Sequence, residues 1–141
     1  MKKFISLSLL AFIVTSLFTI NSVGNSKNSQ TSVSKSAKVE VYYFHYTRRC
    51  VTCQAVETES QSAIAALYPA QIKNGLITFK AVNLDEKTNE TLAKKYKVEG
   101  SALLVIKAGK RIDLTDKAFM YAKNSPDKLK AELKNTIDAL F

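Results

Sequence analysis

The first clear pattern of apolar and polar positions predicts a β-strand followed closely by a helix. Residues 38–44 (KVEVYYF) are rich in β-branched and aromatic side chains, as expected of a largely buried strand. From Cys50 to about Tyr68, apolar residues recur near one helical face, namely Val56, Ile64, Leu67 and Tyr68. Pro69 then marks the end of this helix or a kink in it. The strand and the helix are therefore separated only by the short stretch that ends at Cys50.

The following pattern predicts a second strand and helix and then a hairpin. Strands are expected over 76–84 and 101–107, with a short helix over 88–96 that Gly100 breaks. The apolar run of 76–84 predicts a strand covered by helices on both faces. A tight turn at 108–110 leads into 111–114, which favours a hairpin, whereas residues 115–124 form no recognisable pattern.

The last helix has the clearest start signals in the chain. Ser125 is a suitable N-cap, Pro126 fits the first helical position, and Asp127 complements the helix dipole. A buried stripe follows at Leu129, Leu133, Ile137 and Leu140. The resulting order is β-α-β-α-β-β-α, in which the βαβ opening predicts parallel strands and the hairpin predicts an antiparallel edge. The predicted fold class is therefore α/β, with a mixed central sheet and helices on both faces.

The first 37 residues do not belong to this pattern. Two lysines and an apolar run to Ile20 precede small residues suited to cleavage after Gly24, which predicts a signal peptide over 1–24. Retention of this segment as a membrane anchor is the alternative. A Ser- and Asn-rich linker over 25–37 then leads to a single domain over 38–141. We therefore expect an exported protein, in the periplasm or at the extracytoplasmic face of the membrane.

The formal net charge of +9 raises the question of a nucleic-acid partner. The lysines are spread over the predicted helices and do not form a cluster, and an exported protein meets little nucleic acid. We therefore expect no nucleic-acid partner. An anionic membrane surface or an acidic protein suits this charge better.

The junction between the first strand and helix holds both cysteines and the only histidine of the chain. A helix start favours an anion, and Arg48 and Arg49 add positive charge directly before Cys50. Both effects stabilise a thiolate, the reactive form of cysteine. We interpret Cys50 as the attacking thiol and Cys53, one turn further along, as the partly covered resolving thiol.

Other uses of this cysteine pair are less well supported by the pattern. A disulfide that closes so small a ring removes little chain entropy and stabilises a fold poorly. A structural zinc site needs about four ligands, whereas the chain offers two cysteines and His45, and the arginines disfavour a cation. His45 is either a packing residue of the strand or a proton shuttle or third ligand near the dithiol. A redox-active dithiol is the favoured interpretation.

A strand followed by a CxxC helix spans residues 39–53, and the chain continues with VNLD (82–85), LAKKYKVEG (92–100) and LLVIKAGK (103–110). On these segments the domain resembles the thioredoxin-like superfamily. The YYFH segment before the dithiol is also similar to a small thioredoxin-like family associated with arsenic-resistance operons, some members of which are labelled as nitroreductase subunits. The resemblance implies a thioredoxin-like fold and thiol–disulfide chemistry.

Three departures from the thioredoxin pattern bear on the chemistry. Arg49 and the pair Val51-Thr52 replace the family's tryptophan and Gly-Pro, so the reducing potential of thioredoxins does not carry over. Phe44 stands near the family's buried acid, which leaves open how Cys53 loses its proton. Ser101 and Ala102 stand where the family has a substrate-facing cis-proline, and we expect a trans peptide there.

The sequence therefore predicts an exported thiol–disulfide oxidoreductase that works through a mixed disulfide of Cys50 resolved by Cys53. Arg48, Arg49 and His45 are the expected tuning residues, and Ser101 and Ala102 form the substrate-facing loop. We expect no organic cofactor, a monomer, and a protein thiol, a protein disulfide or a membrane electron donor as partner. The alternative is a binding protein that holds Cu(I) or trivalent arsenic through Cys50, Cys53 and His45.

Overall fold

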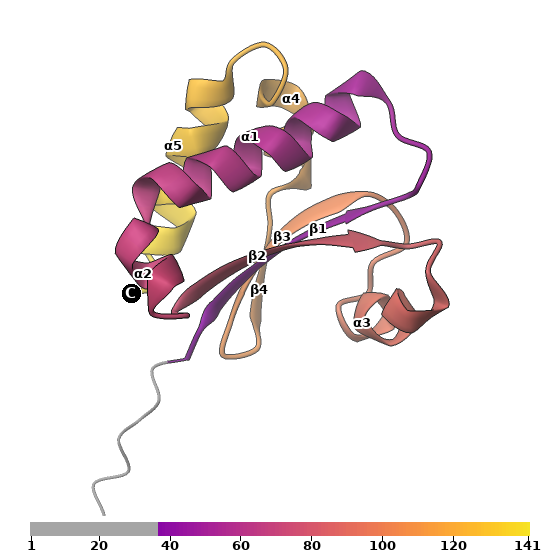
Figure 1. The fold of residues 1–141 in the computed structure, drawn as a ribbon, viewed down its shortest axis with the longest axis horizontal. Coiled ribbons are helices and arrows are strands. Elements are labelled where there is room, and N and C mark those ends of the chain that lie inside the picture. Colours follow the sequence, from indigo (N-terminus) through magenta and orange to yellow (C-terminus); the bar gives the residue numbers. More distant parts are fainter. Residues whose placement is uncertain (1–36) are drawn as a thin grey trace, which may run out of the picture. The chain divides into compact units, whose positions relative to one another are not determined.

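The computed structural model of the protein describes residues 37–141 (Figure 1). The predicted signal peptide at 1–24 and nearly all of the predicted linker at 25–37 lie outside the described residues, so both stay predictions. No helix within the described part combines the length and the apolar character needed to cross a bilayer.

Four strands form one mixed sheet in the order β2-β1-β3-β4. Their bounds are Val39–His45 for β1, Ile77–Asn83 for β2, Ala102–Lys107 for β3 and Lys110–Asp113 for β4. β1 pairs in parallel with β2 and antiparallel with β3, and β3 pairs antiparallel with β4. The mixed sheet predicted from the sequence is thus confirmed, and β1, which leads to the dithiol, lies inside it.

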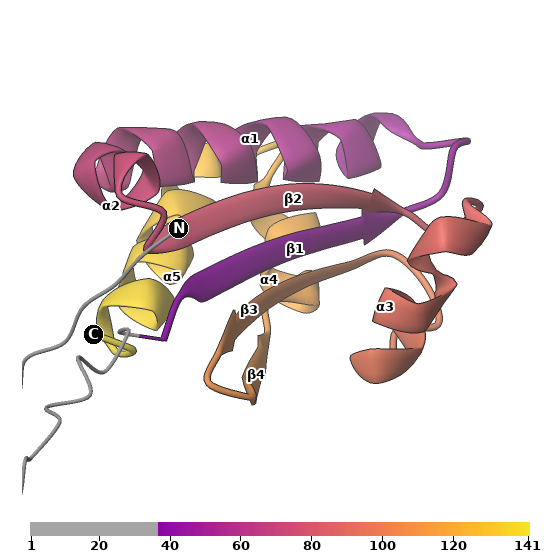
Figure 2. The same cartoon turned by 60° about the horizontal axis from the view of Figure 1, so that its bottom comes forward.

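Residues 37–141 also form five α-helices and one 3-10 helix. Figure 2 shows the α-helices around the sheet. α1 (Val51–Leu67) and α2 (Pro69–Lys73) join β1 to β2, and η1 (Lys87–Asn89) with α3 (Glu90–Lys95) joins β2 to β3. α4 (Thr115–Tyr121) and α5 (Pro126–Asp138) follow the hairpin of β3 and β4. The kink expected at Pro69 is the boundary between α1 and α2. Ser125 is the N-cap of α5 as predicted, although its side chain makes no capping hydrogen bond.

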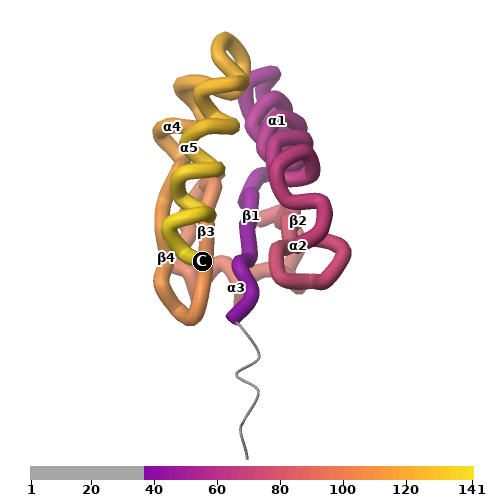
Figure 3. Tube along the Cα trace, turned by 90° about the vertical axis from the view of Figure 1, so that its left-hand side faces the viewer, coloured from indigo at the N-terminus to yellow at the C-terminus, as the bar shows by residue number. Residues whose placement is uncertain are grey.

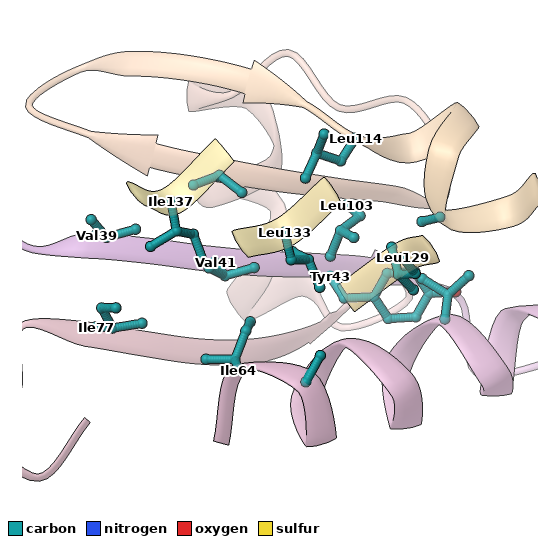
Figure 4. Close-up of a cluster of buried hydrophobic side chains, with 14 of the residues drawn as sticks. Val39, Val41, Tyr43, Ile64, Ile77, Leu103, Leu114, Leu129, Leu133 and Ile137 are labelled. Atoms are coloured by element: carbon teal, nitrogen blue, oxygen red, sulfur yellow. The ribbon is translucent and has the colours of Figure 1, made fainter. Parts of the chain in front are cut away.

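Two cores cover the two faces of the sheet because successive side chains of a strand point to opposite sides. Val39, Val41 and Tyr43 of β1 face the larger core, together with residues of α1, α4 and α5 (Figure 4). Tyr42 and Phe44 face the smaller core, which α3 covers from the other side. α1 and α5 pack beside each other on the larger core (Figure 3). Helices therefore cover both faces, as predicted.

The structure corrects three details of the predicted elements. β2 is an edge strand whose Lys80 and Ala81 are exposed, so helices do not cover both of its faces fully. α3 ends at Lys95, before Lys97 in the left-handed region with φ of 53°, so Gly100 does not break it. Residues 115–121, whose pattern was unclear, form α4. The expected turn at 108–110 is a two-residue hairpin turn, in which Ala108 and Gly109 have φ of 50° and 82°.

Candidate active site

Cys50 occupies the point where the chain passes from the sheet into α1. β1 ends at His45, four loop residues follow, and Cys50 is the N-cap of α1 with an extended backbone (φ −77°, ψ 166°). The Cys53 backbone N–H donates a hydrogen bond to Cys50 Sγ over 3.2 Å. This sulfur therefore takes the place that a Ser or Asp oxygen occupies in an ordinary N-cap. The helix start thus presents a hydrogen-bond donor and partial positive charge to Cys50.

The two cysteines form a disulfide, with their Cα atoms 5.1 Å apart. Cys50 is exposed to solvent and Cys53 is half-buried, which is the order of exposure expected of an attacking and a resolving thiol. Val51 between them is 67% exposed, so no part of residues 37–141 covers this side of the dithiol. An incoming sulfur atom can therefore reach Cys50 before it reaches Cys53.

The loop before Cys50 is held by hydrogen bonds with the last residue of β2 and with the segment that follows it. The Thr47 backbone N–H donates to the Asp85 carboxylate over 2.8 Å, and the Asn83 side-chain amide donates to Thr47 Oγ1 over 2.8 Å. The hydrogen bond from Thr47 lowers the pKa of the Asp85 carboxyl below its usual value. On the other side of the loop, the Tyr46 hydroxyl donates to the Glu99 carbonyl over 3.1 Å. Two separate parts of the chain therefore fix this loop.

The two arginines before Cys50 lie in different surroundings. Arg48 is exposed, whereas Arg49 is half-buried and forms an ion pair with Glu57 on α1. The sequence pattern predicts two free charges beside Cys50 and gives no sign of Glu57. No local pattern indicates this pair, because the two residues are eight positions apart and only one of them belongs to the helix.

Tyr43, like Glu57, belongs to the site, although the sequence pattern predicts only a core position for it. Its side chain is fully buried, and its hydroxyl donates to the Cys53 carbonyl over 2.9 Å. Burial raises the pKa of the Tyr43 hydroxyl, and the positive charge of Arg49 partly opposes this rise. This hydrogen bond thus attaches the first turn of α1 to β1. Alternation along β1 predicts the face on which Tyr43 lies, but not this contact.

His45 is 8% exposed at the end of β1. Its Nδ1 lies 2.9 Å from the Tyr46 carbonyl oxygen, and because a carbonyl only accepts, Nδ1 is the donor. Its ring lies beside that of Tyr43, with centroids 5.7 Å apart. Within residues 37–141, no three His, Cys, Asp or Glu side chains are grouped so as to hold a metal ion. The structure therefore does not join His45 to the two cysteines in a three-ligand site.

Ser101 and Ala102 lie where β3 begins. Ala102 is buried and pairs with Phe44, the residue that stands near the expected position of the family's acid. Every peptide bond in the described part of the chain is trans, which confirms the expectation for this loop. Gly100, Ser101 and Ala102 line an open cleft of about 320 Å³. The loop thus presents backbone and small side chains to this cleft.

A CxxC pair at the start of the helix after a central strand, in a sheet of order β2-β1-β3-β4, is the arrangement that the resemblance to thioredoxins implies. The fold is thioredoxin-like. This assignment rests on the strand order and on the position of the dithiol. Thiol–disulfide exchange is the chemistry that a cysteine pair of this kind can perform. The similarity to the family associated with arsenic resistance stays a prediction.

The solved structures that are similar to this chain include two thioredoxins. No protein-family model and no curated protein matches the chain. The germline-specific thioredoxin Deadhead of Drosophila melanogaster is 20% identical, with a TM-score of 0.48 over 74% of this chain and 82% of that one. Thioredoxin-2, a component of the secretion machinery of the malaria parasite, is 24% identical, with a TM-score of 0.46 over 70% and 84%. A structure described as a malarial protein is 24% identical, with a TM-score of 0.45 over 70% and 96%.

Proposed function

We propose that this protein is an exported thiol–disulfide oxidoreductase that uses the Cys50–Cys53 couple through a mixed disulfide. The observation that carries the proposal is the position of the two sulfur atoms. Cys50 is the exposed N-cap of α1, and Cys53 is half-buried behind it. A purely structural disulfide gains nothing from this exposure, whereas an exchange catalyst requires it.

In the reducing direction, the Cys50 thiolate attacks one sulfur of a substrate disulfide. The substrate S–S bond breaks, one substrate thiolate leaves, and Cys50 is joined to the other sulfur in a mixed disulfide. Cys53 then loses its proton and attacks Cys50 Sγ, which forms the Cys50–Cys53 disulfide and releases the second substrate thiolate. Two electrons thus pass to the substrate. The same steps in reverse oxidise a substrate dithiol.

The surroundings of Cys50 suit this role. The helix start and the Cys53 N–H stabilise negative charge on Cys50 Sγ, and the exposed Arg48 adds a full positive charge nearby. The loop of residues 46–49 is fixed by hydrogen bonds on both sides, so the thiolate is held in place before substrate arrives. No organic cofactor takes part in these steps.

The proposal of export rests on the sequence of residues 1–24, which has the pattern of a signal peptide or anchor. Outside the cytoplasm the couple rests oxidised unless a partner supplies electrons. We therefore propose a protein thiol, a protein disulfide or a membrane electron donor as partner of the monomer. The direction of electron flow depends on the reduction potential.

The decisive experiment is equilibration of the full-length protein with glutathione buffers of known ratio. A potential between about −120 and −270 mV lies in the range of exchange catalysts, and its position there separates an oxidant from a reductant. A disulfide that resists reduction below about −300 mV would be structural and would overturn the proposal. A dithiol that never forms the disulfide would favour binding of a thiophilic ligand instead.

A trapping experiment tests the assignment of the two cysteines. The Cys53→Ser variant is expected to accumulate a mixed disulfide with a small protein disulfide, because no resolving thiol remains. The Cys50→Ser variant serves as the matched control and is expected to trap much less, since its remaining thiol is half-buried. Equal trapping by both variants would contradict the assigned roles. If Cys50→Ser behaved like the natural protein in every assay, the dithiol would be vestigial.

A further inference from the structure

The ion pair of Arg49 and Glu57 lies along the first two turns of α1. Arg49 precedes the N-cap, and Glu57 is the seventh residue of the helix. Arg49 therefore reaches the helix from the loop before it, across the extended backbone of Cys50. The ion pair thus joins the loop before Cys50 to the second turn of α1. Both side chains are partly shielded from water, with exposed fractions of 27% and 25%.

Glu57 lies on the side of the helix that carries Cys53. Cys53 and Glu57 are four positions apart and are therefore neighbours on one helical face. Helical side chains lean toward the N-terminus, which directs Glu57 over the turn that contains Cys53. Tyr43 provides an independent indication, because its hydroxyl bonds to the Cys53 carbonyl and the charge of Arg49 also acts on it. Arg49 and Glu57 thus place opposite charges beside the dithiol.

We propose that Glu57 tunes the dithiol by neutralising Arg49, which makes the Cys50–Cys53 couple less oxidising than its two arginines would make it. The proposal rests on the proposed function and adds a residue that the sequence pattern did not indicate. Glu57 is a positioning residue, since it acts on the sulfur atoms through the charge and orientation of Arg49.

The physical reason is that reduction converts a neutral disulfide into a state with thiolate character. A free positive charge nearby stabilises that reduced state and makes the couple more oxidising. An ion pair has no net charge, so its field on the sulfur atoms is much weaker than that of Arg49 alone. Two other charged groups lie around the loop, namely Arg48 and Asp85. Arg48 is exposed to solvent, and the Asp85 carboxylate accepts a hydrogen bond from the Thr47 N–H, so neither takes part in the Arg49–Glu57 ion pair.

The test is the reduction potential of four full-length proteins in glutathione buffers at one pH, namely the natural protein, Glu57→Gln, Arg49→Gln and the double variant. Glu57→Gln is expected to shift the equilibrium constant about tenfold toward the reduced dithiol, or about 30 mV for this two-electron couple. Arg49→Gln leaves Glu57 unpaired and is expected to shift it in the opposite direction. The double variant is expected to return close to the natural value.

Opposite signs that cancel in the double variant separate tuning from structural damage, because damage in both single variants would not cancel. Glu59→Gln is the matched control, since it removes the same charge from the same helix two positions further along, on another face. Equal shifts in Glu57→Gln and Glu59→Gln, or no shift in either, would overturn the proposal. If the natural protein shows no reversible couple, the proposed function itself fails. A reversible couple that Glu57→Gln leaves unchanged refutes this inference alone.

Discussion

Ser60 offers a direct test of how the larger core is built, because its hydroxyl is buried without a partner. It lies on α1, its side chain is 0% exposed, and its Oγ has no hydrogen-bond partner within residues 37–141. A buried hydroxyl that has lost its bonds to water and gained none in return destabilises the folded state. Replacement by alanine keeps the helix and removes only this hydroxyl. We therefore expect Ser60→Ala to be more stable than the natural protein.

The size of the effect follows from two contributions. Relief of an unsatisfied buried hydroxyl is worth about 1–3 kcal/mol, and alanine is preferred over serine in a helix by about 0.5 kcal/mol. The small space left by the missing oxygen atom subtracts part of this gain. The net expectation is an increase of about 1–2 kcal/mol in the free energy of unfolding. For a domain of this size, that corresponds to a rise in melting temperature of roughly 4 °C or more.

The assay is reversible urea unfolding of the oxidised full-length protein, followed by circular dichroism. Ser62→Ala is the matched control, since Ser62 is exposed on the same helix and its replacement adds helix propensity without removing a buried hydroxyl. Ser62→Ala is therefore expected to gain only about 0.5 kcal/mol. The difference between the two variants measures the cost of the buried oxygen atom.

The reasoning would be refuted if Ser60→Ala gained no more than Ser62→Ala, or lost stability. Either result would mean that the Ser60 hydroxyl is satisfied in the folded protein, for example by a backbone carbonyl one turn earlier on the helix or by a buried water molecule. An unchanged dependence of the unfolding free energy on urea concentration would show that the comparison reports the native state.

Two further predictions concern the supports of the dithiol. Asp85→Ala removes the acceptor of the Thr47 N–H, so thiol–disulfide exchange is expected to slow by up to about tenfold in stopped-flow assays. An unchanged rate would show that the loop before Cys50 keeps its conformation without this hydrogen bond. The pKa of the Asp85 carboxyl is lowered in the folded protein, so its contribution to stability is present above about pH 4 and is lost as the pH falls through the folded value. Asp85→Ala should lack this loss of stability in acid. Tyr43→Phe removes the hydrogen bond to Cys53 and is expected to cost about 1 kcal/mol in urea unfolding, while no loss would mean that this bond is not formed. Because burial raises the pKa of Tyr43, its contribution to stability is present below about pH 10 and is lost as the pH rises through the folded value. The pKa values of Tyr42 and Tyr68 are raised too, so Tyr43→Phe is expected to reduce the alkaline loss of stability without removing it.

Elements with a strong local signal were predictable from the sequence. The β-branched and aromatic run of β1, the tight turn after β3 and the start of α5 each depend on residues close together in the chain. α4 was not recognised because its buried positions are chiefly Ala118 and, just beyond its end, Ala122. Alanine contributes little to an apolar pattern, and a helix of two turns is too short to show one clearly.

The edge position of β2 shows a different limit of the sequence. An apolar run predicts burial of a strand, but which strands lie beside it depends on pairing between distant segments. Here β1 covers one edge of β2, and no described strand covers the other, which leaves Lys80 and Ala81 exposed. The sequence alone does not say which strand of a sheet lies at the edge.

The candidate site also combines features that the sequence predicts with features that only the fold decides. The sequence by itself determined the two sulfur atoms, their spacing and their place at a helix start, because these depend on neighbouring residues only. The tertiary structure alone decided that Arg49 pairs with Glu57, that Tyr43 bonds to the Cys53 carbonyl, and that Asp85 holds the loop before Cys50. The physical reason is that charges and hydrogen bonds act over a few ångströms of space, whatever the separation along the chain. Folding brings such partners together, and their identity follows from the packing of whole elements.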